Sequence, residues 1–228
     1  MTTTSEAAPR VLDEHARLSL GSSHGAIYRM VADALAARGI GGERFIDVGC
    51  GGGALRTFVQ DRFTHYVGMD GVRYDDLPAD VEFHQLDLDG SAPLPADAGG
   101  ADVAAAVETI EHLENPRALA RELVRLVKPG GWVILTTPNQ RSLLSLVTLI
   151  TKGRFSAFQD SHYPAHITAL LDVDLRRIGA EVGLTDVAIG YSRHGRIPLT
   201  PWHYPTAVST LFPRALSDNL LVIGRKPE

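Results

Sequence analysis

The chain has 228 residues, 44% of them hydrophobic, which is enough to bury one substantial core and predicts a single domain. Its formal net charge is −5 and it has no long run of like charge, which argues against a nucleic-acid partner. The single cysteine, Cys50, excludes an intramolecular disulfide and favours a reducing cytoplasm. The longest strongly apolar run, residues 143–150, is too short to span a bilayer.

Residues 1–20 are polar and irregular, and we expect a flexible arm there, followed by a single domain over 21–228. Apolar side chains recur at helical spacing between residues 23 and 38, which predicts a helix that Gly39 ends. Strands are then expected over residues 45–48, 64–69, 81–86 and 102–107, separated by helices and, over 90–100, by a surface loop rich in proline and glycine.

The most informative segment is the strand at 45–48 with the turn that follows it, which has glycine at 49, 51, 52 and 53. Glycine lets the backbone turn sharply and approach a ligand that a Cβ would block. A helix expected over 54–61 would aim its free amides across this turn. The next strand ends in Asp70, where a carboxylate suits the two hydroxyls of a ribose. The segment therefore predicts a site for a nucleoside cofactor.

The second half of the chain continues the alternation with two interruptions. Asn115 predicts a helix N-cap, with Pro116 in the first turn. Further elements are expected as strands over 132–137, 184–190 and 219–224 and a helix over 168–182. Long connections over 139–166 and 191–213 break the pattern. The seven strands predict a doubly wound, mostly parallel α/β sheet with an antiparallel hairpin at its C-terminal end.

The glycine spacing from Gly49 to Ala54 also fits the dinucleotide fingerprint, so by itself it leaves a dehydrogenase open. Asp47 before the turn, Asp70, Asp87 after the third strand and the turn at 128–131 together resemble the class I S-adenosylmethionine-dependent methyltransferases. The resemblance covers about residues 43–137 and implies a Rossmann-like fold with S-adenosylmethionine as cofactor. The expected cofactor contacts are Asp47, Gly49, Cys50, Gly51, Asp70, Gly71, Asp87, Leu88 and Glu108.

Glu108, Glu111 and His112 leave the fourth strand at the edge of the sheet where the activated methyl group should point. Positioning supplies much of the rate of methyl transfer, but an alcohol or amine acceptor must also lose a proton. We expect His112, with Glu111 beside it, to act as the catalytic base at neutral pH. A structural His112 that only hydrogen-bonds a backbone carbonyl is the alternative.

The motif Glu108-x-x-Glu111-His112-Leu113, with 136–139 further on, resembles the ubiquinone-pathway O-methyltransferases and many methyltransferases of sugar and secondary-metabolite pathways. The RNA 3′-terminal 2′-O-methyltransferases share much of this motif. That second resemblance implies a divalent-metal set of Glu108, Glu111, His112 and His166, although the rest of the RNA enzymes' signature is absent here. We expect no metal and keep this set as the alternative.

The acceptor pocket is expected on the two long connections and the 1–38 segment. Aromatic and imidazole side chains there suit a partly apolar small molecule with hydroxyls, although they can also simply pack the connections onto the sheet: Phe155, Phe158, His162, Tyr163, Trp202 and His203. Residues 143–150 are left open as a lid, a dimer face or a buried helix. The sequence thus favours a monomeric or homodimeric small-molecule O-methyltransferase of a biosynthetic pathway. An RNA-terminal methyltransferase and a non-catalytic S-adenosylmethionine-binding subunit are the alternatives.

Overall fold

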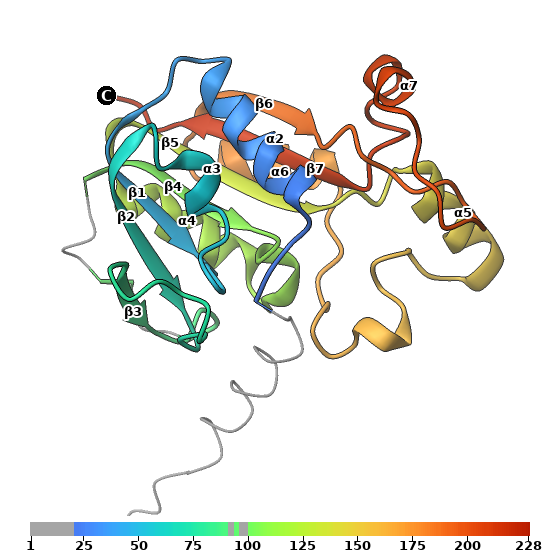
Figure 1. The fold of residues 1–228 in the computed structure, drawn as a ribbon, viewed down its shortest axis with the longest axis horizontal. Coiled ribbons are helices and arrows are strands. Elements are labelled where there is room, and N and C mark those ends of the chain that lie inside the picture. The colour runs from blue at the N-terminus through green and yellow to red at the C-terminus, as the bar shows by residue number, and fades with distance from the viewer. Residues whose placement is uncertain (1–20, 91–93, 96–99) are drawn as a thin grey trace, which may run out of the picture.

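The computed structural model describes residues 21–90, 94–95 and 100–228. The arm expected over 1–20 and most of the loop expected over 90–100 lie outside the described residues. Seven strands form one sheet in the order β3-β2-β1-β4-β5-β7-β6 (Figure 1). Strands β1 to β5 pair in parallel, and β7 lies antiparallel between β5 and β6. The predicted fold class is therefore confirmed, whereas the single domain over 21–228 stays a prediction.

The elements follow the expected order along the chain. The strands are β1 (Gly42–Val48), β2 (Phe63–Asp70), β3 (Glu82–Gln85), β4 (Ala101–Val107), β5 (Val127–Pro138), β6 (Thr185–Tyr191) and β7 (Asn219–Arg225). The helices are α2 (Gly25–Ala36), α3 (Arg56–Val59), α4 (Pro116–Leu126), α5 (Leu143–Lys152), α6 (Asp172–Glu181) and α7 (Thr206–Leu211), with 3₁₀ turns η2 (Ile110–His112) and η3 (Asp160–His162).

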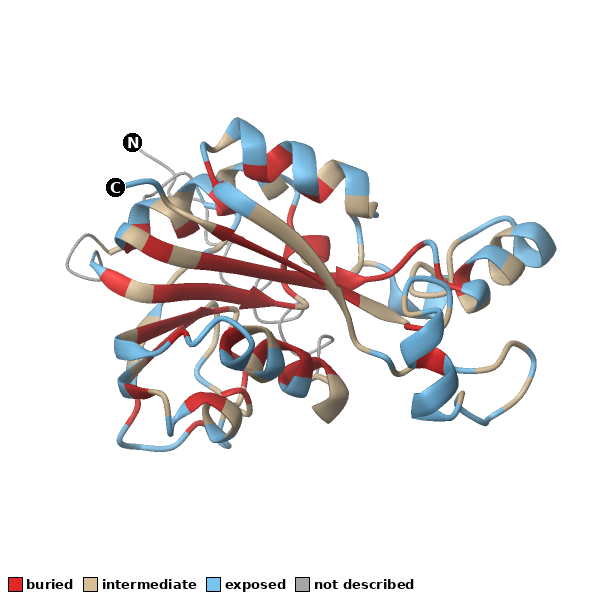
Figure 2. Cartoon of the chain, turned by 90° about the horizontal axis from the view of Figure 1, so that it is seen from above, coloured by how far each residue is buried: buried red, intermediate tan, exposed pale blue. Residues whose placement is uncertain are grey.

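The sheet is buried between two apolar layers, as Figure 2 shows for its central strands. On one face α4 packs against β4 and β5 and α6 packs against β6 and β7, and Leu123 and Ile178 belong to the apolar core between these helices and the sheet. On the other face α2 packs against α3, β6 and β7, in a second apolar core that includes Leu35 and Phe45. Because β4 is covered on both sides, it is apolar except for Asp102, and β1 is buried over its last four residues, whereas β3 at the sheet edge is partly exposed.

Local sequence signals account for the start of α4. The Asn115 side chain accepts a hydrogen bond from the Ala118 amide at 3.0 Å, and Pro116 occupies the first turn. Both expectations are confirmed. Only three residues separate η2 from α4, so the cap also sets where the chain turns back along the sheet.

The helix expected over 54–61 is wrong in its extent, because α3 covers only four residues. Its first residues include Thr57 and the aromatic Phe58, which are weak helix formers, and β2 begins already at Phe63. No side chain caps α3 at its N-terminus. The amides of the glycine turn are engaged, since Gly49 and Cys50 donate to the Met69 carbonyl and Gly51 donates to Asp70.

The two long connections, residues 139–171 and 192–218, leave the sheet at the same end and carry α5 and α7 (Figure 1). We call them together the protrusion. Asn139, which is 2% exposed, ties them to each other: its side-chain amide donates to the carbonyls of Arg214 and Ser217, both at 2.8 Å. The Leu143 amide adds a bond to the Ala215 carbonyl at 2.7 Å. The protrusion is thus held together at its base.

Replacing Asn139 by Ala should lower the free energy of unfolding by about 1–3 kcal/mol, because two carbonyls lose their donor at a buried position. Urea denaturation measures this loss. Asn115→Ala, which removes a single cap bond on α4, serves as the control, with a cost of about 1 kcal/mol. Limited proteolysis within 192–218 should accelerate in Asn139→Ala only. Equal proteolysis of the two variants would contradict the tie.

Candidate active site

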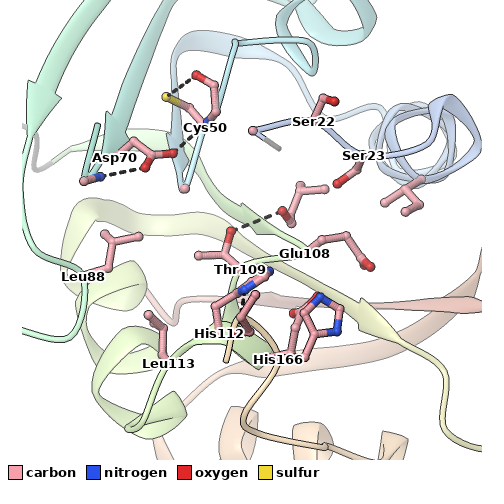
Figure 3. Close-up of a pocket in the computed structure, with 18 of the residues that line it drawn as sticks. Ser22, Ser23, Cys50, Asp70, Leu88, Glu108, Thr109, His112, Leu113 and His166 are labelled. Carbon is pink, nitrogen blue, oxygen red and sulfur yellow. Dashed lines mark hydrogen bonds between the residues drawn. The ribbon is translucent and has the colours of Figure 1, made fainter. Parts of the chain in front are cut away.

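A cavity of about 470 Å³ opens at the carboxyl ends of β1, β2 and β4, within the usual range for a small-molecule site. Figure 3 shows its walls, which come from the glycine turn, the strand ends, η2 and the segment before α2. The cavity lining includes every residue expected to contact the cofactor: Asp47, Gly49, Cys50, Gly51, Asp70, Gly71, Asp87, Leu88 and Glu108. Glu111, His112, His162, Tyr163 and His166 line it as well.

The glycine turn is fixed by a carboxylate. Asp70 accepts the Gly51 amide at 2.8 Å and the Gly71 amide at 2.7 Å. Burial raises the pKa of Asp70, although these amide donors counteract it. A Cβ at Gly51, whose φ is +52°, would lie 1.9 Å from the carbonyl oxygen of Gly21, so no other residue allows the two segments to approach this closely. Asp70 therefore shapes the turn and presents carboxylate lone pairs to the cavity.

Asp47 lies at the bottom of the cavity and is 2% exposed. The Tyr66 hydroxyl donates to its Oδ2, while its Oδ1 has no hydrogen-bond partner among the described residues. Burial raises the pKa of Asp47 to about 7. A buried carboxylate with an unsatisfied oxygen favours a ligand that brings a donor or a positive charge.

Glu108 closes β4 in a conformation unusual for a side-chain-bearing residue, with φ at +51°. The Thr136 hydroxyl donates to its Oε1 at 2.9 Å and the Asn219 amide to its Oε2 at 2.7 Å. Burial outweighs these donors and raises the pKa of Glu108 to about 7. The strained backbone is thus held by bonds from β5 and β7.

Glu111 is fully buried, and neither carboxylate oxygen has a hydrogen-bond partner within the described parts of the chain. Burial, together with the charge of Glu108, raises its pKa well above the ordinary value. The Thr137 hydroxyl lies near enough to lower that pKa slightly, yet it makes no hydrogen bond of normal geometry. The backbone carbonyl of Glu111 accepts the amides of Ile167 at 3.0 Å and Thr168 at 2.9 Å. These two bonds bring the 165–168 segment against η2.

Two imidazoles face each other at this junction. His112 Nδ1 lies 2.8 Å from the Ala165 carbonyl and His166 Nδ1 lies 2.7 Å from the Ala157 carbonyl. Because a carbonyl only accepts, each neutral ring carries its proton on Nδ1 and has its basic lone pair on Nε2. The ring centroids are 4.7 Å apart in an edge-to-face arrangement. Burial lowers the pKa of His166, with a smaller contribution from His162. Both rings are thus oriented by their backbone contacts.

Glu111, His112 and His166 each place one possible ligand atom within 4.8 Å of the others. One carboxylate with two imidazoles is a set that suits a divalent transition metal. The carbonyl partners of both Nδ1 atoms are the kind of outer contact that orients metal-bound histidines. Glu108, the fourth member of the alternative metal set, does not join this cluster, because Thr136 and Asn219 engage its carboxylate.

The charge of the cavity is one-sided. No Lys or Arg occurs among the described residues that line it. The acids that line it include Asp47, Asp70, Glu108 and Glu111. The pKa of each of these four acids is raised, with burial as the leading cause. A cationic ligand would relieve both the burial and the mutual repulsion of the carboxylates.

The residues expected to bind the acceptor separate into two groups. His162 and Tyr163 line the cavity, whereas Phe155, Phe158, Trp202 and His203 are not among its lining residues. The Phe158 ring packs against His166, and the Trp202 side chain is 71% exposed. The reason is geometric, since the connections extend beyond the sheet and only their parts nearest the strands reach the cavity. The acceptor role of these residues stays a prediction.

The residues just before α2 and in its first turn contribute more to the cavity than the sequence indicated. Ser22, Ser23, His24, Ile27 and Tyr28 all line the cavity. From the sequence, residues 1–38 as a whole are expected on the acceptor side, with no single residue distinguished. The only local signal was the polar Ser22-Ser23-His24 ahead of a helical pattern, and His24 indeed caps α2 by accepting the Ala26 amide at 3.2 Å.

Comparison with known proteins agrees with this geometry. A family model described as a methyltransferase domain matches residues 18–189. The ubiquinone biosynthesis O-methyltransferase of Aeromonas salmonicida is 28% identical over 153 residues, which is 64% of either chain. That of Erwinia tasmaniensis is 31% identical over 130 residues, half of either chain. The chain thus spans about half to two thirds of the length of the curated relatives it matches.

Solved structures share the fold. A S-adenosylmethionine-dependent methyltransferase from Archaeoglobus fulgidus superimposes with a TM-score of 0.59 at 18% identity, over 87% of this chain and 94% of that one. Phosphoethanolamine N-methyltransferase 2 of Haemonchus contortus, solved with S-adenosyl-L-methionine, superimposes with a TM-score of 0.57 at 15% identity. The superposition covers 86% of this chain and 52% of that one. At these identities the similarity concerns the architecture of the sheet and its helices.

The buried acids make the stability of the ligand-free protein depend on pH. In the unfolded chain Asp has a pKa of about 3.9, and in the folded chain the pKa of Asp47 is about 7. The folded state therefore holds more protons between these values, and its stability should fall as the pH rises through this window. We expect Asp47→Asn to remove on the order of 2 kcal/mol of this decline between pH 5 and pH 7.

Urea denaturation at a series of pH values measures the effect. Asp80→Asn is the matched control, because Asp80 is an exposed carboxylate whose pKa is lowered by Arg56 and not raised by burial. It should keep the wild-type slope over the same range. A wild-type slope in Asp47→Asn would show that Asp47 is ionised in the empty cavity.

Proposed function

Because the chain belongs to the methyltransferase domain family, we propose that it transfers the methyl group of S-adenosylmethionine to a hydroxyl group of a small molecule. The observation that carries the proposal is the single cavity that joins the acidic strand ends to Glu111 and His112. The relatives named as ubiquinone biosynthesis O-methyltransferases support oxygen as the acceptor atom and a biosynthetic role. The acceptor itself is then a small molecule that enters beside His162 and Tyr163.

The acidic strand ends fit the polar groups of this cofactor. Asp70 offers carboxylate oxygens to the ribose hydroxyls, and the bare backbone of Gly49 and Gly51 permits close approach. Asp47, with its unsatisfied oxygen, would pair with the ammonium of the amino-acid end. Asp87 would accept from the adenine amino group. The excess of carboxylates over basic groups also favours a sulfonium, which carries a positive charge.

The bound cofactor supplies a methyl group on a sulfonium, which departs as a neutral thioether. The chain must then orient the acceptor and remove its hydroxyl proton. His112 would take that proton on Nε2, while the Ala165 carbonyl continues to hold Nδ1–H and fixes the ring. Glu111, once ionised, would stabilise the resulting imidazolium within the same cluster.

A metal-assisted form of this transfer is the second candidate, and the cluster of Glu111, His112 and His166 favours it. A divalent cation there would lower the pKa of a coordinated acceptor hydroxyl, and the two histidines would serve as ligands. The sequence also left open the methylation of an RNA 3′ end. An acidic cavity in a chain with a net charge of −5 would repel the phosphates of RNA, which disfavours that alternative.

The described residues contain no helix long and apolar enough to cross a membrane. The monomeric or homodimeric state and the cytoplasmic location expected from sequence stay predictions. A non-catalytic binding subunit is disfavoured by the cofactor-side acids and the Glu111–His112 pair sharing one cavity.

The cofactor site is tested by calorimetry with S-adenosylhomocysteine. Asp70→Ala should weaken binding by about 1–3 kcal/mol, because the ribose hydroxyls and the Gly51 amide lose their acceptor. Asp70→Asn retains one acceptor oxygen for the turn and separates loss of the turn from loss of the carboxylate. Asp80→Ala should bind like the wild type. Tight binding of NAD together with no response to S-adenosylhomocysteine would refute the cofactor assignment.

His112 separates the mechanisms. If it is the general base, His112→Ala should lower kcat by about 10²–10⁴ with little change in cofactor affinity. Activity of the wild type should then rise as the pH is raised through the range in which an imidazole loses its proton, near a pKa of about 6.5 for a free side chain. The assay needs an accepted hydroxyl compound, found by screening phenols and sugars for thermal stabilisation in the presence of S-adenosylhomocysteine.

His166→Ala decides between base and metal ligand. In the general-base mechanism this variant loses far less activity than His112→Ala, and a chelator has no effect. In the metal-assisted mechanism both variants and Glu111→Gln lose similar activity, and the chelator reproduces the loss. If activity falls only in proportion to thermal stability in every variant, the cluster is structural.

A further inference from the structure

Helix α5 has the reverse of the usual burial pattern. Its sequence is Leu-Leu-Ser-Leu-Val-Thr-Leu-Ile-Thr-Lys, yet its one fully buried residue is Ser145. Leu146 is 41% exposed and Ile150 is 84% exposed. A helix on the surface of a water-soluble domain normally turns such side chains inward. Helix α7 repeats the pattern, with Ser209 buried and Leu211 74% exposed.

Specific hydrogen bonds hold both helices in this orientation. The Ser145 hydroxyl donates to Gln140 Oε1 at 3.3 Å and accepts the Ser156 amide at 3.2 Å. The Ser209 hydroxyl donates to the Arg193 carbonyl at 2.7 Å. In each helix the buried serine is hydrogen-bonded to a neighbouring segment of the protrusion. The apolar side chains on the opposite side of the helix therefore point toward solvent.

The exposed apolar side chains are concentrated at this end of the molecule. Every large hydrophobic side chain that is exposed in the described residues lies on the protrusion, apart from Val173 on α6. Those on the protrusion are Leu143, Leu146, Ile150, Tyr163, Ile167, Leu199, Trp202, Val208, Leu211 and Phe212. Figure 1 places both α5 and α7 beyond the same end of the sheet. Exposed apolar surface of this extent marks an interaction site.

The charge of the protrusion is opposite to that of the remaining chain. It contains six basic side chains, Arg141, Lys152, Arg154, Arg193, Arg196 and Arg214, and two acidic ones, Asp160 and Asp218. Its formal charge is therefore +4, within a chain of −5. Arg141 and Arg214 pair with Asp172, and Arg154 pairs with Asp160. Lys152, Arg193 and Arg196 form no salt bridge with any described residue.

We propose that the protrusion docks the protein onto an anionic lipid bilayer surface, with the outward side chains of α5 and α7 in the headgroup layer and Lys152, Arg193 and Arg196 against lipid phosphates. Apolar helix faces flanked by basic residues bind such interfaces without spanning them. The ring of Trp202, 71% exposed, suits the headgroup level. The acidic remainder of the chain would be repelled by the bilayer, so the protrusion faces it.

A second copy of the chain is the competing occupant. A symmetric dimer through the same apolar faces would bring two charges of +4 together, which disfavours it. Membrane docking requires no such contact between like charges. It also does not depend on which acceptor is methylated.

The test is sedimentation of the full chain with vesicles of phosphatidylcholine, with and without phosphatidylglycerol. We expect binding to the anionic vesicles that weakens at high salt. The combined variant Ile150→Ser, Trp202→Ser and Leu211→Ser should bind at least about tenfold more weakly, because three apolar anchors are lost. These side chains are 71–84% exposed, so the fold is kept, and unchanged binding of S-adenosylhomocysteine verifies this. Val173→Ser, which changes the exposed residue outside the protrusion, is the matched control.

Charge is tested separately. Lys152→Glu with Arg196→Glu should also reduce binding to anionic vesicles by roughly tenfold, while Arg121→Glu on α4 leaves it unchanged. Two results would each overturn the proposal: no vesicle binding, or equal binding with and without phosphatidylglycerol. A third would be a wild-type dimer in light scattering that does not bind vesicles, together with a triple variant that is monomeric.

Discussion

The two amide hydrogen bonds to the Asp70 carboxylate are the constraint on which the site depends. The bond from the Gly51 amide, at 2.8 Å, fastens the glycine turn after β1 to the end of the neighbouring strand, and the bond from the adjacent Gly71 amide, at 2.7 Å, orients the carboxylate. The turn in turn receives the backbone of Gly21, whose carbonyl accepts the Gly52 amide at 2.9 Å. The wall made by residues 21–28 is thereby positioned against the strand ends. One carboxylate thus organises three separate segments around a single cavity.

Several features of the cavity destabilise the ligand-free protein and favour the binding of a cationic ligand. Four buried or half-buried acids without Lys or Arg in the described lining, and a left-handed Glu108, are unfavourable features in an empty protein. They are supported by bonds from elsewhere, such as those of Thr136 and Asn219 to Glu108. The same features become favourable when a cationic ligand enters. We therefore regard the cofactor as part of the stabilising interactions of the fold.

Much of this arrangement was predictable from the sequence, for reasons that hold at the level of single residues. Asp47, Asp70 and Asp87 come at the ends of apolar strands, and parallel strands bring such ends together. His112 follows β4 in the same way. The exposed position of Trp202 was not predictable, because the 191–213 connection has no periodicity to define which side faces the core.

The short α3 and the contribution of Tyr28 escaped prediction for a related reason. Whether a helix continues past four residues depends on where β2 must start, and whether an N-terminal segment reaches the site depends on long-range contacts such as Gly21 with the glycine turn. Local propensity contains neither piece of information. Likewise, a run such as residues 143–150 is normally assigned to a core, and only the bonding of Ser145 shows that its apolar side faces outward.

The position of the protrusion has a consequence for protein engineering. Residues 139–171 run from the end of β5 to the start of α6, and residues 192–218 run from the end of β6 to the start of β7. The three strand ends are neighbours, since Pro138 pairs with Asn219 and Tyr191 pairs with Leu220. A transplant of both connections would therefore have four junctions, three at one end of β5, β6 and β7 and one at the start of α6, while the glycine turn stays untouched. Asn139, which bonds across both connections, would have to move with them. The sheet with its glycine turn would thus stay constant, while the protrusion could be exchanged as one unit.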